Sequence, residues 1–122
     1  MKMNLPTQEV SGELIHSDAN NVLVDHMQAP SFPDGHWYQI YNPEKFTVDI
    51  SFQNGPVKEH GVNGATSEAL LAILIHRTKV LDGNFPCDEN KRAITYMENA
   101  LALFEQRTKD RQKRGVEGFN KA

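Results

Sequence analysis

The chain has 122 residues, 39% of them apolar, and a formal net charge of −3 at neutral pH, which fits one domain or two small units. The lone Cys87 excludes an intramolecular disulfide, and no apolar run approaches the roughly 20 residues needed to cross a bilayer. The acidic balance argues against a general nucleic-acid binder, and no secretory signal is recognisable, so we expect a reducing cytosol as the setting.

Strand and turn patterns dominate the first half of the chain. Residues 46–52 alternate apolar and polar side chains, which predicts a strand with one apolar face. Residues 37–41 are predicted to pair with it, because the segment from Asn42 to Lys45 supplies turn residues between the two. Two shorter strands are predicted at residues 14–16 and 22–26, with a turn between them at residues 17–20. A loop is predicted at residues 29–35. We therefore expect a small antiparallel sheet.

The second half changes to the periodicity of helices. Thr66 is expected to cap a helix that runs to about Leu81, and Asp88 is expected to cap a second, amphipathic helix after a turn. Two such helices with a short connection pack antiparallel. The predicted fold class is thus α+β, with an N-terminal antiparallel β-sheet domain over residues 1–60 and a C-terminal antiparallel helical hairpin domain over residues 61–122.

Basic residues are concentrated late in the chain. Residues 1–62 carry eight acidic side chains and three lysines, whereas residues 63–122 carry eight acids and ten bases. Arg107, Arg111 and Arg114 have the spacing i, i+4, i+7, so a helix would place them on one face. Their planar guanidinium groups can hold phosphate oxygens in pairs. They can equally form an ordinary basic helix end, worth about 0.3 to 1 kcal/mol each, and the spacing leaves both interpretations open.

Two further features lie beside the predicted helices. The glycines at 115 and 118 are typical of a helix C-cap, or of a turn that brings backbone amides or Glu117 near a ligand. Phe85 and Asn90 bracket the start of the second helix. Phe85 is either a staple that closes the hairpin or a stacking platform for a base, and Asn90 is either a surface residue or a reader of the base edge.

No catalytic or metal-binding motif is recognisable. The five histidines and the single cysteine lack metal-ligand spacing, and the glycine-rich loops of phosphoryl transferases and serine hydrolases are missing. We therefore expect a non-enzymatic protein that needs neither a metal nor a cofactor.

Three segments, at residues 61–71, 85–90 and 107–118, resemble in order and spacing the helical hairpin of the phage anti-defence sponge proteins. Two groups share this hairpin. The first Thoeris anti-defence protein family adds an N-terminal β-domain, whereas a shorter anti-CBASS sponge is nearly hairpin alone. Because its first half is rich in predicted strands, the chain resembles the Thoeris group, with a likeness that covers residues 52–118 well and the first half in outline.

The resemblance implies a protein that binds and sequesters a cyclic ADP-ribose isomer, glycocyclic ADP-ribose, in the cytoplasm of the infected bacterial host without cleaving it. It also implies separate sites for cyclic di- or trinucleotides, homodimers, and hexamers built from dimers, with no membrane or nucleic-acid polymer as a partner. A small phage nucleic-acid-binding regulator and an enzyme that cleaves the same signal are the alternatives.

The resemblance also implies roles for individual residues. Phe85 and Asn90 would contact a base or ribose, and Arg107 and Arg111 would contact phosphates. Further candidates for a cyclic-nucleotide site or for assembly are Asn63, Gly64, Thr66, Arg114, Gly115, Val116 and Glu117. One departure is Asp88, an acid where the family pattern leads us to expect a cation, which would weaken phosphate binding there.

Overall fold

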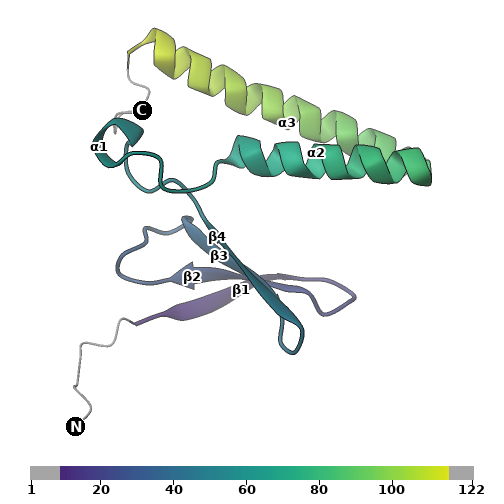
Figure 1. Ribbon diagram of the computed structural model, residues 1–122, viewed down its shortest axis with the longest axis horizontal. Coiled ribbons are helices and arrows are strands. Elements are labelled where there is room, and N and C mark those ends of the chain that lie inside the picture. Colours follow the sequence, from purple (N-terminus) through teal and green to yellow (C-terminus); the bar gives the residue numbers. More distant parts are fainter. Residues whose placement is uncertain (1–8, 116–122) are drawn as a thin grey trace. The chain divides into compact units, whose positions relative to one another are not determined.

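The computed structural model describes residues 9–115. Strands β1 to β4 are followed by a one-turn helix α1 and two long helices (Figure 1). The elements are β1 Ser11–Ser17, β2 Leu23–Gln28, β3 Trp37–Asn42, β4 Phe46–Ser51, α1 Val57–His60, α2 Ser67–Asn84 and α3 Asp88–Lys113. This arrangement confirms the predicted α+β class.

The chain divides into two compact units. The sheet unit comprises the chain up to Gly55 together with residues 62–64, and the hairpin unit comprises residues 56–61 together with the chain from Ala65 onward. That residues 1–60 and 61–122 behave as separate domains stays a prediction.

The sheet unit is a meander of four antiparallel strands in the order β1-β2-β3-β4. The predicted hairpin of β3 and β4 is confirmed, with a register that runs from Trp37 opposite Ser51 to Asn42 opposite Phe46. Asn42 forms the turn: its side-chain oxygen accepts from the Glu44 amide at 3.1 Å, and its carbonyl accepts from the Lys45 amide at 3.2 Å. An asparagine at the first position of a turn favours this geometry.

Strand β1 is longer than the sequence pattern predicts. It begins at Ser11, because its backbone pairs with β2 over residues that show no apolar alternation, and a bulge interrupts the register between Leu14 and His16. The predicted turn after it is confirmed, since the Asp18 carboxylate accepts from the amides of Asn20 and Val22 at 2.9 and 3.0 Å. Pairing with a neighbouring strand thus sets the length of β1.

The helical hairpin forms as predicted, with two corrections at its turn. Thr66 caps α2, because its hydroxyl accepts from the Ala69 amide at 3.1 Å. Helix α2 continues to Asn84 and not only to about Leu81, since the Asp82 side chain accepts from the Cys87 amide beyond the helix and does not break it. The predicted cap of α3 at Asp88 is wrong: Cys87 is the cap, and its sulfur accepts from the Asn90 amide at 3.4 Å.

Helices α2 and α3 lie side by side and run antiparallel (Figure 1). A salt bridge of 3.0 Å joins Lys79 to Glu98, and the Thr108 hydroxyl donates to Glu68 at 3.3 Å. None of the described helices is long and apolar enough to span a membrane.

The described part of the chain has a thin core. Among residues 9–115 only Met27 in β2 and Ile75 in α2 are buried apolar residues, at 8% and 7% exposure. Many large apolar side chains remain exposed on both units. Small chains often gain the missing stability by self-association.

Candidate functional site

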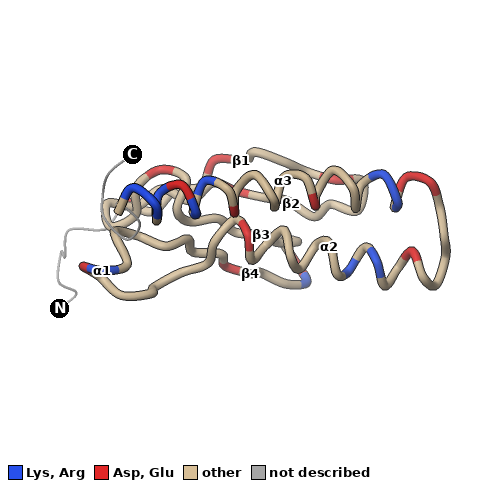
Figure 2. Tube along the Cα trace, turned by 90° about the horizontal axis from the view of Figure 1, so that it is seen from above, with Lys and Arg blue, Asp and Glu red and all other residues tan. Residues whose placement is uncertain are grey.

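The last turns of α3 carry an arginine-lined cavity. Arg107, Arg111 and Arg114 lie around an open hollow of about 620 Å³, and Figure 2 shows basic residues concentrated at this end of the helix. The full lining is Leu103, Gln106, Arg107, Asp110, Arg111, Lys113 and Arg114. The predicted co-facial spacing of the three arginines thus produces one cationic surface, which we call the arginine cavity.

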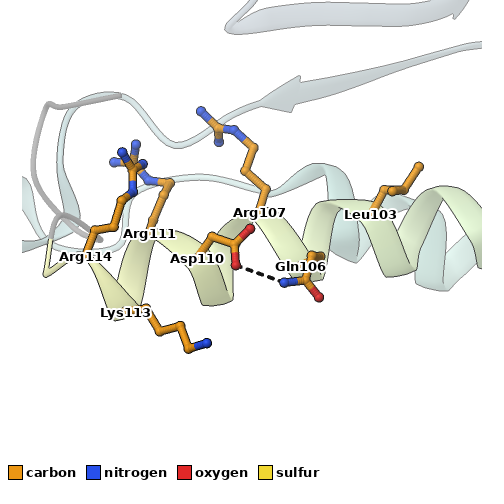
Figure 3. A pocket seen from close by; sticks show the side chains of 7 residues that line it. All are labelled: Leu103, Gln106, Arg107, Asp110, Arg111, Lys113 and Arg114. Atoms are coloured by element: carbon orange, nitrogen blue, oxygen red, sulfur yellow. Dashed lines mark hydrogen bonds between the residues drawn. The ribbon is translucent and has the colours of Figure 1, made fainter.

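The side chains of the arginine cavity differ in direction and burial. Figure 3 shows the three arginines extending to the same side of α3, whereas Lys113 extends to the other side. Arg111 is half-buried, while Arg107 and Arg114 are exposed. Leu103 adds an exposed apolar surface, 72% accessible, one turn before Arg107. Forked donors beside an apolar side chain suit a ligand with phosphates and a flat, weakly polar ring.

Phe85 and Asn90 lie at the opposite end of the hairpin. Phe85 forms the C-cap of α2 and is 81% exposed, so its ring does not close the hairpin as a staple, and Asn90 is half-buried in the first turn of α3. Arg107 lies seventeen positions after Asn90 along α3, which corresponds to about 25 Å. Within one hairpin, the predicted base-binding residues and the predicted phosphate-binding residues are therefore too far apart to hold one nucleotide.

The turn beside Phe85 is held by Asp82. Its carboxylate accepts from the Cys87 amide at 3.0 Å and forms a salt bridge of 3.0 Å with Lys91. The Cys87 amide and then the Lys91 ammonium lower the pKa of Asp82 below its usual value. Asp88, where a cation was expected, is exposed and lies 3.7 Å from Arg92. The Asp82 contacts fix the backbone that presents Phe85.

The linker candidates have structural roles, Asn63 and Gly64 in the sheet unit and Thr66 in the hairpin unit. Asn63 pairs with the backbone of Asn54 in both directions, accepting from its amide and donating to its carbonyl at 2.8 Å each. A Cβ atom at Gly64 would lie 2.4 Å from the Phe52 carbonyl carbon, so only glycine fits there. Thr66 caps α2. A ligand contact by these three residues stays a prediction.

The predicted turn after α3 is only partly described. Arg114 is the C-cap, and Gly115 follows with a φ of 70°, the left-handed conformation that glycine adopts at a helix end. This confirms the C-cap interpretation for Gly115. Val116 and Glu117 lie outside the described residues, so their predicted ligand contacts remain untested.

An exposed apolar surface on α2 was not predicted from the sequence. Helix α2 carries a stripe of exposed or half-buried apolar side chains that point away from the α3-facing residue Ile75. It comprises Leu70, Ile73, Leu74, Val80 and Leu81. We call it the α2 seam. Ile73 and Val80 are seven residues apart, as are Leu74 and Leu81, which is the heptad spacing of a helix that packs against another helix. This spacing is visible in the sequence.

Residues 9–115 hold no group of three or more histidine, cysteine, aspartate or glutamate side chains able to bind a metal ion. The arginine cavity contains donors for anions and one carboxylate, which suits reversible binding of a phosphorylated molecule.

Comparison with known proteins identifies the family of the chain. The family model described as "Acb2/Tad1, hairpin domain" matches residues 44–109, more than half of the chain. A protein named Thoeris anti-defense 1, from Bacillus phage SBSphiJ7, is 47% identical over 92 residues. That match covers 68% of this chain and 65% of the relative, so just under two thirds of the relative's length is matched. The chain therefore belongs to the Acb2/Tad1 hairpin-domain family.

Proposed function

We propose that the protein is a phage anti-defence sponge that binds and sequesters a cyclic ADP-ribose isomer, glycocyclic ADP-ribose, without cleaving it. The observation that carries the proposal is the arginine cavity, which offers three guanidinium groups on one side of α3. The diphosphate of such a ligand fits these donors. The name of the similar Bacillus phage protein supports a role against the Thoeris defence system.

The ligand site is completed by a second copy of the chain. Asn90 lies about 25 Å along α3 from Arg107, and Phe85 precedes α3. One hairpin therefore offers the phosphate donors and the aromatic ring at opposite ends. Two hairpins paired antiparallel about a two-fold axis would place the arginine cavity of one beside Phe85 of the other. Each such dimer contains two equivalent sites, with the base stacked on the partner's ring.

The α2 seam provides the surface for that pairing. Ile73 is 62% exposed, and Leu74, Val80 and Leu81 are between 41% and 49% exposed. Covering these side chains contributes about 1 kcal/mol each, or roughly 8 kcal/mol for two copies before the entropic cost of association. An antiparallel two-fold pairing of α2 with itself buries the same stripe on both copies. Hexamers built from such dimers, and separate sites for cyclic di- or trinucleotides, are further parts of this proposal.

Retention of an intact nucleotide tests the function. Purified protein is mixed with glycocyclic ADP-ribose, passed over a desalting column and heat-denatured, and the released nucleotide is identified by mass spectrometry. Release of the unchanged ligand is expected. A converted product would instead indicate an enzyme, and no retention at micromolar concentrations would contradict the sponge. The same assay with a cyclic dinucleotide, a cyclic trinucleotide and duplex DNA separates the other ligand classes.

A further inference from the structure

Asp110 is an acidic residue within an otherwise cationic cavity. Its neighbours in the lining include Arg107, Arg111 and Arg114, yet no ion pair of Asp110 is found within residues 9–115. The Gln106 amide instead donates to its carboxylate at 2.9 Å (Figure 3). One carboxylate oxygen of Asp110 is thus oriented by a neutral donor.

A carboxylate in an anion site has opposite effects on two kinds of ligand. It repels phosphate oxygens and so weakens the binding of a bare phosphate anion. It also accepts hydrogen bonds from hydroxyl or amine groups, and a bond to a charged acceptor contributes more than a bond to a neutral one. A ligand that carries such donors next to its phosphates offsets the repulsion with these hydrogen bonds, whereas a bare phosphate anion cannot.

We propose that Asp110, oriented by Gln106, is a specificity-determining residue of the arginine cavity. It selects a phosphorylated ligand that presents ribose hydroxyl or amine donors beside its phosphates, and it rejects inorganic phosphates. The inference rests on the proposed function and deepens it, because it states how the site distinguishes a nucleotide from the abundant simple phosphates of a cell.

A purely structural role for the pair is the competing explanation. Glutamine and aspartate four residues apart on a helix stabilise that helix slightly. That role predicts a small change in helix stability when Asp110 is replaced, and it predicts no change in the preference between two ligands. The ratio of two affinities therefore separates the explanations.

The test compares glycocyclic ADP-ribose with inorganic pyrophosphate, which brings phosphate oxygens without a ribose or a base. Dissociation constants are measured by calorimetry at one ionic strength for the wild type and for Asp110→Asn. We expect pyrophosphate to bind more tightly to the variant and the nucleotide to bind more weakly, so that the preference for the nucleotide falls about tenfold. Gln106→Leu, which removes the orienting amide, should lower the preference by a smaller factor.

Glu105→Gln is the matched control. It makes the same change of charge on the same helix, but position 105 lies about 160° around α3 from Arg107 and is not part of the cavity. The preference of this variant for the nucleotide over pyrophosphate should stay within about twofold of the wild-type preference. An Asp110→Asn protein that binds both ligands with the wild-type preference would overturn the inference alone. A wild-type protein that retains no nucleotide would overturn the proposed function and the inference with it.

Discussion

Replacing Arg107 tests whether the arginine cavity holds phosphate. Arg107 is exposed, and Figure 3 shows it on the same side of α3 as the other two arginines. A hydrogen bond between charged partners contributes about 1.5 to 3 kcal/mol, so Arg107→Ala should weaken binding of glycocyclic ADP-ribose by roughly 10- to 150-fold. Arg107→Lys keeps the charge but loses the fork that grips two oxygens, and it should fall between alanine and the wild type.

Lys109→Ala is the control for the Arg107 variants. It removes a positive charge from α3 only two residues away, on the opposite side of the helix and outside the arginine cavity. Calorimetry on the three variants and the wild type gives the comparison, with melting curves to confirm that each protein is folded. Equal losses for Arg107→Ala and Lys109→Ala would show that the cluster acts only as a basic helix end.

Three further predictions concern the scaffold. Gly64→Ala should lower the melting temperature, because its Cβ would lie 2.4 Å from the Phe52 backbone. Gly83→Ala meets open space in α2 and should stabilise the folded protein by up to about 1 kcal/mol, and thermal melts of both variants test the two expectations. The pKa of Asp82 is lower in the folded protein than in the unfolded chain, so its stabilising contribution is present above the unfolded pKa and is lost as pH falls through the folded pKa. The difference in stability between wild type and Asp82→Asn should therefore shrink below about pH 4. A constant difference at lower pH would contradict the role given to Asp82. Ile73→Glu should dissociate the proposed dimer in sedimentation experiments, whereas Ala72→Glu, at an exposed position of α2 outside the α2 seam, should not.

The fold was largely predictable because its elements have strong local signals. The alternation in β4, the asparagine turn before it and the Thr66 cap each specify local backbone geometry, and each is confirmed. The ends of elements were less predictable. Strand β1 is extended by pairing with β2, and the cap of α3 is Cys87, whose sulfur accepts from the Asn90 amide.

The candidate site was predictable in part. The arginine spacing identified the cationic surface, because three residues on one helix face need no tertiary information. The distance from Phe85 to the arginine cavity depends on α3 being one continuous helix from Asp88 to Lys113, and the structure shows that it is. Gln106 and Asp110 gave no separate signal, since a polar pair four residues apart is common on helix surfaces.

A mixing experiment tests the central claim that two copies of the chain build each ligand site. One variant lacks the phosphate donors, Arg107→Ala with Arg111→Ala, and the other lacks the base contacts, Phe85→Ala with Asn90→Ala. Each variant alone should fail to retain glycocyclic ADP-ribose. After the two are unfolded and refolded together in equal amounts, half of the dimers are mixed, and each mixed dimer has one intact site and one doubly altered site.

The amount of nucleotide retained by the refolded mixture is the decisive measurement. The antiparallel dimer predicts recovery of about a quarter of the wild-type binding capacity, with wild-type affinity at the recovered sites. Size-exclusion chromatography with a tag on one variant confirms that mixed dimers have formed. A mixture that contains mixed dimers but retains no nucleotide would contradict the shared site.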